Sequence, residues 1–202
     1  MKMERGAVLH GHYVVKDNLG FGTSGMVVGA VDIRTQTPVA IKISQATNTV
    51  YRERNILNEL KKKGVNNVAE LLDSFEHFVN AKKYLCLVFT LLSFDLVGIV
   101  ERCHKHGIPM YTRGIPLDYV RGVTKSLLEV LESLAGLNVV HADLKMENVC
   151  MKDWKEPTSA TLVDFGLSDV EGRFPRNVVV QTRFYRAPEV LMGLTPTAAI
   201  DM

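Results

Sequence analysis

The stretch HADLKMEN at residues 141–148 directly follows an apolar run that ends at Val140. Within this stretch, Asp143 and Asn148 bracket Lys145. A carboxylate and an amide at such positions act as proton acceptors or as hard oxygen ligands, the kind that Mg²⁺ uses together with phosphate groups. Taken alone, the stretch also fits an ordinary loop with a capping aspartate. Its meaning therefore depends on what the rest of the chain supplies.

A further acidic residue lies downstream in TLVDFGL at residues 161–167, a stretch that we expect to be strand-like. Asp164 follows its apolar part and is itself followed by the flexible Gly166. Asp143, Asn148 and Asp164 are therefore the candidate groups for metal binding and proton transfer.

Upstream, LGFGTSGMV at residues 19–27 fits the spacing Gly-x-Gly-x-x-Gly, with Gly20, Gly22 and Gly25. Glycines let backbone amides approach a phosphate because no Cβ is in the way. A glycine-rich hairpin turn is the alternative interpretation. The β-branched residues that follow predict a second strand and not the helix of a dinucleotide-binding fold, which excludes most Rossmann-type interpretations.

Lys42 lies inside the apolar strand VAIKI at residues 39–43. A lysine that is buried without a counter-charge is costly, so Lys42 either points outward or has an acidic partner. In the predicted helix at 52–63, Glu53 lies at the centre of the apolar arc, whereas Glu59 lies outside it. Glu53 is therefore the candidate partner of Lys42, and the pair would hold the lysine toward a phosphate bound under the glycine loop.

The chain divides into two lobes of different character. From Tyr13 to Ile43, β-branched runs separated by turns predict an antiparallel meander, and strand-like segments return up to about residue 90. Beyond that point the pattern is helical, with an apolar stripe that runs from Val120 to Leu134. We therefore expect an α+β fold with an N-terminal lobe at residues 1–92, built from a small antiparallel sheet and one main helix, and a helical lobe at residues 93–202.

The composition is that of an ordinary globular protein. The 202 residues include 24 basic and 22 acidic ones, so the net charge of +2 gives no strong field toward nucleic acid or an anionic membrane. Three cysteines without Cys-x-x-Cys spacing argue against a disulfide framework and are typical of a reducing compartment. The N-terminus lacks a secretory signal, and the longest apolar run, at 84–92, is too short to span a bilayer. We expect a soluble intracellular protein that binds neither nucleic acid nor membranes directly.

Together, these motifs resemble a eukaryotic protein kinase over nearly the whole chain, from the glycine loop to RAPE at residues 186–189. DLKMEN is similar to the serine/threonine class. HADLK, LVFTLLSFDL, QTRFYRAPEVLMGL and the terminal AIDM resemble the homeodomain-interacting protein kinases and the dual-specificity tyrosine-regulated kinases. The resemblance implies a bilobal kinase fold and transfer of the γ-phosphate of ATP to serine or threonine of protein substrates.

The resemblance also implies a role for each residue of the motifs. Asp143 would orient the substrate hydroxyl and accept its proton, Lys145 would neutralise the γ-phosphate, and Lys42, paired to Glu53, would hold the α- and β-phosphates. Asn148 and Asp164 would hold Mg²⁺. The implied nucleotide contacts are Leu19, Gly20, Phe21, Gly22, Thr23, Ser24, Gly25, Met26, Val27, Ala40, Lys42, Phe89 and Leu92.

Within that set, Val27 and Ala40 would lie against the adenine, and Phe89 would precede a hinge at Thr90, Leu91 and Leu92. His141 is expected to be structural. Arg183 and Arg186, which flank Phe184 and Tyr185, resemble the segment that shapes the substrate pocket of proline-directed kinases, which predicts a preference for Ser-Pro or Thr-Pro.

Two departures from the family pattern concern regulation. Ala142 stands where many kinases carry an arginine, so a latch between that arginine and an activation-loop phosphate is missing. Val179 stands where the nearest relatives carry the activation-loop tyrosine, so we expect the loop to be held by packing or by another signal.

The resemblance further predicts that Asp201 opens a central helix that continues beyond Met202, so the helical lobe is expected to be incomplete and to leave an apolar patch. A catalytically silent module that binds nucleotide or a partner is the alternative to an active kinase. A location in the nucleus or cytoplasm follows only from the resemblance. The native substrate and the oligomeric state are not legible from the sequence.

Overall fold

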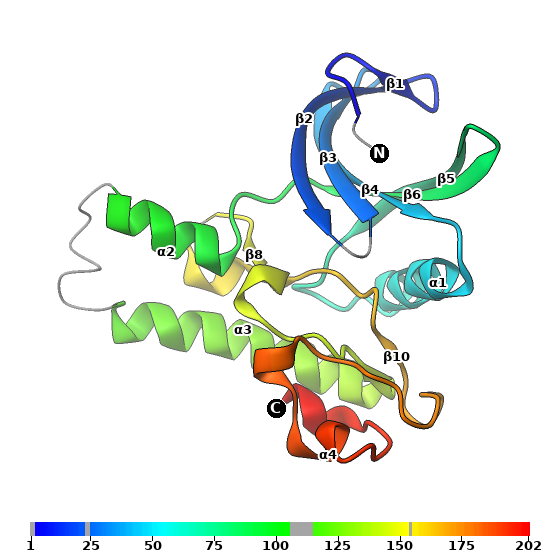
Figure 1. The fold of residues 1–202 in the computed structure, drawn as a ribbon. Coiled ribbons are helices and arrows are strands. Elements are labelled where there is room, and N and C mark those ends of the chain that lie inside the picture. The colour runs from blue at the N-terminus through cyan, green and yellow to red at the C-terminus, as the bar shows by residue number, and fades with distance from the viewer. Residues whose placement is uncertain (1–2, 23–24, 106–114, 154) are drawn as a thin grey trace. The chain divides into compact units, whose positions relative to one another are not determined.

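The computed structural model describes residues 3–22, 25–105, 115–153 and 155–202, with the side chains of 102–105 left out. The chain forms two compact units (Figure 1). The first consists of Met1–Lys62 and Ala69–Leu91, and the second of Lys63–Val68 and Leu92–Met202. The division expected from the sequence, after residue 92, differs in that the structure places 63–68 and Leu92 in the second unit.

Six strands of the first unit's described residues form one antiparallel sheet in the order β1-β2-β3-β4-β6-β5. They are β1 (Val8–Leu9), β2 (Tyr13–Gly22), β3 (Gly25–Asp32), β4 (Thr37–Gln45), β5 (Leu71–Val79) and β6 (Lys82–Thr90). The predicted meander is confirmed, because β2, β3 and β4 are consecutive antiparallel neighbours. The two-residue strand β1 was not predicted.

Alternation along these strands gives the sheet two different faces. One face is closed by a hydrophobic core that includes Met26, Val28, Ile41 and Val88. On the other face, cross-strand partners bring Val27, Lys42 and Leu87 into one row and Gly29, Ala40 and Phe89 into the next. Helix α1 (Asn48–Lys62) packs on β5 and β6 and starts four residues before the predicted 52.

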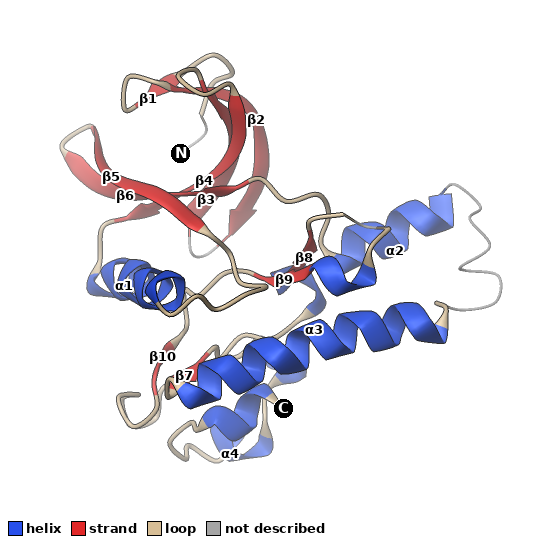
Figure 2. Ribbon diagram, turned by 180° about the vertical axis from the view of Figure 1, so that it is seen from behind, coloured by secondary structure: helices blue, strands red, loops and turns tan. Residues whose placement is uncertain are grey.

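The second unit is mainly helical (Figure 2). Its elements are α2 (Leu96–Lys105), α3 (Leu117–Gly136), α4 (Pro188–Leu191), the short strands β7 (Val139–Val140), β8 (Val149–Met151), β9 (Ala160–Leu162) and β10 (Asp169–Val170), and the 3-10 turns η1 (Met146–Asn148), η2 (Pro157–Ser159), η3 (Arg183–Tyr185) and η4 (Ala198–Asp201). The short strands pair as two antiparallel ladders, β7 with β10 and β8 with β9. Sheet and helices together confirm the α+β class.

The prediction of an apolar stripe on α3 is confirmed only in part. Val123, Val130 and Leu134 are buried, but Val120 is 43% exposed. Ser126, which is polar, is among the buried residues of α3, and its hydroxyl donates to the carbonyl oxygen of Thr158 at 3.0 Å. A polar residue with a satisfied hydrogen bond can therefore occupy the inner face of a helix.

One further expectation is met only in part. The strand expected at 161–167 is limited to β9, so Asp164 lies outside the ladder. Cys86 is buried and Cys150 half-buried as free thiols, and burial raises the pKa of each to about 12, which makes both unreactive. The side chain of Cys103 lies outside the described residues. No helix within the described ranges is long and apolar enough to cross a bilayer.

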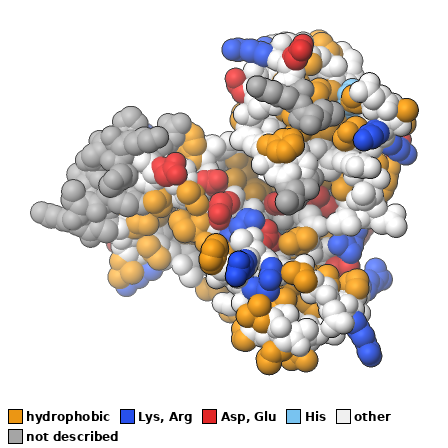
Figure 3. All heavy atoms as spheres, viewed as in Figure 1, with side chains coloured by type: hydrophobic (Ala, Val, Ile, Leu, Met, Phe, Trp, Pro, Cys, Tyr) orange, Lys and Arg blue, Asp and Glu red, His pale blue; other side chains and the backbone are white. Residues whose placement is uncertain are grey.

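Hydrophobic side chains also gather at the surface over α4 (Figure 3), where Leu191, Met192 and Leu194 are exposed. Their neighbours on the inner side, including Phe174, Val180, Val190 and Ile200, form the core beneath. The α4 segment is therefore packed against a core on its inner side, whereas its outer side chains are exposed.

Candidate active site

The predicted glycine loop is a hairpin between β2 and β3, in which Gly22 pairs with Gly25. Thr23 and Ser24 lie outside the described residues. Gly25 has φ +128°, and a Cβ there would lie 2.4 Å from the carbonyl oxygen of Ile43, so only glycine fits. A Cβ at Gly20 or Gly22 would meet open space. The hairpin thus leaves bare backbone that a phosphate can approach.

The predicted ion pair between Lys42 and Glu53 is present. Lys42 Nζ donates to both carboxylate oxygens of Glu53, at 2.7 and 2.9 Å. The two residues are only 7% and 2% exposed. Because both carboxylate oxygens contact the ammonium group, the lysine side chain is held in one position on its face of the sheet.

The other predicted nucleotide contacts in the first unit fall into two groups. Val27, Ala40 and Phe89 share the sheet face of Lys42 and are half-buried, which suits contact with a flat aromatic ligand. Met26 was expected among the contacts, but its side chain lies in the core on the opposite face, because successive residues of a strand alternate. Met26 could therefore contact a nucleotide only through its backbone.

Leu19 and Phe21 lie on β2 with exposed side chains, and the Leu19 side chain lies next to Gly29. Leu92, the last of the predicted contacts, is half-buried and belongs to the second unit.

In the second unit, Asp143 is the centre of a hydrogen-bonded cluster. Its Oδ2 accepts from Lys145 Nζ at 2.8 Å, and its Oδ1 accepts from the hydroxyl of Thr182 at 2.7 Å and from the Thr182 backbone N–H at 2.9 Å. Lys145 also donates to the Thr182 hydroxyl at 3.0 Å. The cluster joins two predicted residues with Thr182, which sequence reasoning did not identify.

These contacts set the charge of Asp143. Burial alone would raise its pKa, but the Lys145 and Thr182 side chains outweigh burial and hold the pKa below its usual value. Asp143 is therefore a carboxylate at neutral pH, able to orient a hydroxyl group and accept a proton from it.

The ladder of β8 and β9 brings Asn148 next to Asp164. Val149 pairs with Leu162, and the N–H of Val163 donates to the carbonyl oxygen of Asn148 at 2.9 Å. The side-chain amide of Asn148 donates to the Asp143 carbonyl oxygen at 2.8 Å and to its Oδ2 at 3.1 Å, which turns the amide oxygen away. Asp164 has φ +61° and leaves the strand direction at this point.

An amide oxygen and a carboxylate at neighbouring positions are a donor set that fits Mg²⁺, which takes few protein ligands and completes its shell with phosphates and water. Among the described residues, no group of three or more His, Cys, Asp or Glu side chains is placed to hold a metal ion.

His141 directly follows β7, is completely buried and bonds to Val163, the residue after β9. Its Nδ1 accepts the Asp143 N–H at 3.2 Å, so Nε2 carries the hydrogen and donates to the Val163 carbonyl oxygen at 3.1 Å. Burial lowers the pKa of His141, against the opposite pull of the Asp201, Asp164 and Asp143 carboxylates. The ring is therefore neutral and connects the loop of Asp143 to the segment of Asp164.

Asp201 is a second residue whose contact was not predicted. Its carboxylate accepts the backbone N–H groups of His141 at 2.6 Å and Ala142 at 2.9 Å. Ala142 has φ +65°, a conformation that is unfavourable for a residue with a Cβ. Asp201 thus holds the loop in the strained shape that presents Asp143.

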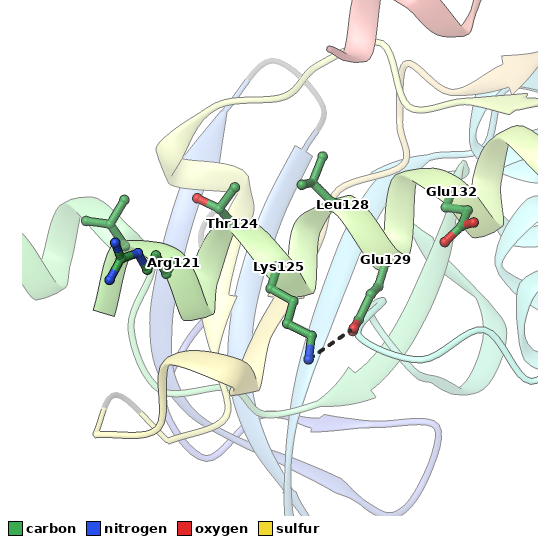
Figure 4. Close-up of a pocket in the computed structure, with 7 residues that line it drawn as sticks. Arg121, Thr124, Lys125, Leu128, Glu129 and Glu132 are labelled. Atoms are coloured by element: carbon green, nitrogen blue, oxygen red, sulfur yellow. Dashed lines mark ion pairs between the residues drawn. The ribbon is translucent and has the colours of Figure 1, made fainter. Parts of the chain in front are cut away.

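A separate depression lies along α3 and contains none of the predicted site residues. Figure 4 shows its lining side chains projecting from that one helix, including Lys125 and Glu129, whose charged atoms lie 3.9 Å apart, and the exposed Leu128. It carries no arrangement of groups for catalysis.

Comparison with known proteins agrees with this geometry. The family model of the protein kinase domain matches residues 13–202, so the chain belongs to the protein kinase family. It is 35% identical to dual specificity tyrosine-phosphorylation-regulated kinase 2 of Drosophila melanogaster, over 94% of this chain and 26% of that protein.

Two further relatives have nearly the same sequence identity to this chain. The chain is 34% identical to dual specificity protein kinase YAK1 of Saccharomyces cerevisiae, over 94% of this chain and 23% of that protein. It is 33% identical to homeodomain-interacting protein kinase 1 of Caenorhabditis elegans, over 94% of this chain and 22% of that protein. The chain thus spans about a quarter of the length of these relatives.

Proposed function

We propose that this chain carries the nucleotide-binding and phosphate-transfer residues of a protein kinase that uses ATP and Mg²⁺ to phosphorylate serine or threonine. The observation that carries the proposal is the cluster of Asp143, Lys145 and Thr182, because it presents an ionised carboxylate beside a lysine. The ion pair of Lys42 and Glu53 supports it independently.

Each group has a distinct task in this scheme. ATP supplies the phosphoryl group and Mg²⁺ neutralises the charge that develops on it. Lys42, fixed by Glu53, holds the α- and β-phosphates, and the bare backbone around Gly20 and Gly22 donates to phosphate oxygens. The side chains of Val27, Ala40 and Phe89 contact the adenine.

The residues of the second unit act on the substrate and the metal. Asn148 and Asp164 hold Mg²⁺ through their side-chain oxygens. Asp143 orients the substrate hydroxyl and accepts its proton, while the Lys145 ammonium group neutralises the γ-phosphate. Catalysis of this kind rests on positioning and charge, so removal of one such group is expected to be severe.

The backbone at Gln181 supports a preference for proline after the acceptor residue. Gln181 has φ +64°, and its carbonyl oxygen accepts from Arg186 Nη2 at 2.9 Å. Arg186 Nε donates to the carbonyl oxygen of Val180 at 3.0 Å. Because the Arg186 guanidinium already donates to both carbonyl oxygens, an N–H of the substrate residue after the acceptor would have to share either oxygen with it. Proline has no N–H to leave unsatisfied, so it is favoured there.

The test of phosphate transfer uses residues 1–202 with a generic basic protein, ATP and Mg²⁺. We expect binding of Mg·ATP and transfer to serine and threonine, with transfer lost in Asp143→Asn and retained in the matched control Asp118→Asn, an exposed aspartate on α3. Binding without any transfer that depends on Asp143 would favour the alternative, a silent nucleotide-binding module. Transfer to tyrosine in place of serine and threonine would contradict the proposed residue class.

The test of proline preference compares peptides that differ only in Ser-Pro against Ser-Ala. We expect a higher kcat/KM for the Ser-Pro peptide, and a reduced ratio in Arg186→Lys, because lysine cannot hold both carbonyls in the planar arrangement of arginine. Equal rates with the two peptides would rule the preference out.

A further inference from the structure

Gln181 combines burial with a strained backbone. It is 6% exposed, and its φ of +64° lies in the left-handed region that residues with a Cβ avoid. Such a conformation persists only where surrounding contacts determine it. The question is what holds it.

The side chain of Gln181 uses both ends of its amide. Nε2 donates to the carbonyl oxygen of Ile200 at 2.8 Å, and Oε1 accepts the backbone N–H of Ala187 at 2.8 Å. The backbone N–H of Gln181 also donates to the carbonyl oxygen of Ala142 at 2.9 Å. One residue therefore joins the segment before α4, the start of α4 and the turn η4.

The partners of Gln181 are themselves attached to the loop of Asp143. Ile200 directly precedes Asp201, whose carboxylate holds the backbone N–H groups of His141 and Ala142. Thr182, the next residue along the chain, donates twice to Asp143 Oδ1. The direction of the Thr182 N–H follows from the backbone conformation at Gln181.

None of the side chains just before Thr182 could order this segment by becoming phosphorylated. Residues 176–181 read RNVVVQ and contain no hydroxyl group, and Val179 is 69% exposed. The Thr182 hydroxyl is already engaged with Asp143 and Lys145. Ordering of residues 176–181 therefore comes from contacts that the unmodified chain makes.

We propose that Gln181 is a positioning residue whose side-chain amide braces the left-handed backbone at 181, so that its carbonyl stays on Arg186 and Thr182 stays on Asp143 without phosphorylation of the segment. The structural part of this inference stands on the contacts above. Its consequence for catalysis and substrate choice rests on the proposed function.

The first test measures amide hydrogen exchange at Thr182. In Gln181→Leu, which keeps the side-chain size and removes both hydrogen bonds, Thr182 exchange should rise about tenfold. Gln181→Gly removes the same bonds but adopts the left-handed conformation without strain, so its Thr182 exchange should rise less. The control Val179→Ala should match the unmodified sequence.

Two results of this experiment would overturn the brace. One is Thr182 exchange that is unchanged in Gln181→Leu. The other is equal acceleration in Gln181→Leu and Gln181→Gly, because the effect would then not depend on the left-handed conformation. Ala187 loses its own acceptor in both variants, so its exchange does not decide the matter.

The second test measures kcat/KM for the Ser-Pro and Ser-Ala peptides. The ratio should fall several-fold in Gln181→Leu, because a relaxed backbone frees the carbonyl of residue 181 for the alanine N–H of the Ser-Ala peptide. It should be largely restored in Gln181→Gly. Phosphatase treatment should leave both the ratio and the Thr182 exchange unchanged, and a loss after treatment would contradict the brace.

The failures of the two proposals can be told apart. Absence of transfer, or equal rates on the two peptides with the unmodified sequence, would overturn the proposed function while Thr182 exchange still tests the brace. Retained discrimination in Gln181→Leu together with unchanged exchange would overturn the brace alone.

Discussion

Lys42 and Glu53 form a buried ion pair in which the ammonium group contacts both carboxylate oxygens. Removal of one partner leaves the remaining charge in a desolvated environment built for the pair, which typically costs about 3–5 kcal/mol. We therefore expect Glu53→Leu to lower the free energy of unfolding of residues 1–202 by about that amount. Urea unfolding curves at neutral pH measure the change.

The matched control removes both charges together. In Lys42→Met with Glu53→Leu, neither charge of the pair is left behind without the other, so most of the lost stability should return although nucleotide binding should not. A double variant no more stable than Glu53→Leu would show that the ion pair is not the source of the loss.

His141 gives the stability a pH dependence of defined sign. Burial lowers its folded pKa below the unfolded value of about 6.5, so between those two values the unfolded chain binds more protons. The contribution is complete above about pH 6.5 and is lost as the pH falls toward the folded pKa, by at most about 1.4 kcal/mol per pH unit. Unfolding free energies measured at pH 7.5 and pH 5.5 should differ accordingly.

The comparison variant is His141→Gln, which keeps an amide able to donate and accept but does not titrate in this range. It should be less stable at pH 7.5 and show a smaller change between the two pH values. The same change in both proteins would assign the pH dependence to other groups.

At the level of elements, the helices and strands with a regular apolar period could be predicted from the sequence. The phase of α1 was correct because helical spacing places Glu53 on the face of Ile56, Leu57 and Leu60, which are the buried residues observed. The meander of β2 to β4 followed equally from β-branched runs and turns. In both cases the information is local.

Contacts between distant segments could not be predicted from local patterns. Strands of two or three residues such as β7 and β8 have no period to detect. The bonds of Thr182 to Asp143 and of Asp201 to Ala142 join residues 39 and 59 positions apart. They arise only once both segments are folded, and that is why Thr182, one of the three residues of the Asp143 cluster, was missed.

The hairpin of β2 and β3 gives a prediction at this scale. Gly25→Ala should destabilise residues 1–202 by more than about 1 kcal/mol, because φ is +128° and the new Cβ would clash with the Ile43 carbonyl oxygen. Gly22→Ala, where a Cβ meets open space, should change stability much less. Thermal unfolding of the two variants measures the contrast, and equal losses would contradict the steric explanation.

At the scale of the whole molecule, each unit has its own core. Ile41 belongs to the core of the first unit and Ile200 to the core around α4 in the second, and both side chains are buried. The two sets share no residue. Because local stability follows the contacts of each cooperative segment, a cavity in one core should first loosen the unit that contains it.

The isoleucines offer a matched pair of truncations for this prediction. Ile41→Ala and Ile200→Ala each remove the same atoms from a packed interior and should each cost about 2–5 kcal/mol. Hydrogen exchange should accelerate mainly in β2, β3 and β4 for Ile41→Ala, and mainly around Val140, Val180 and α4 for Ile200→Ala. Equal acceleration throughout the chain in both variants would mean that the two cores unfold as one cooperative structure, and would refute the separation inferred from their packing.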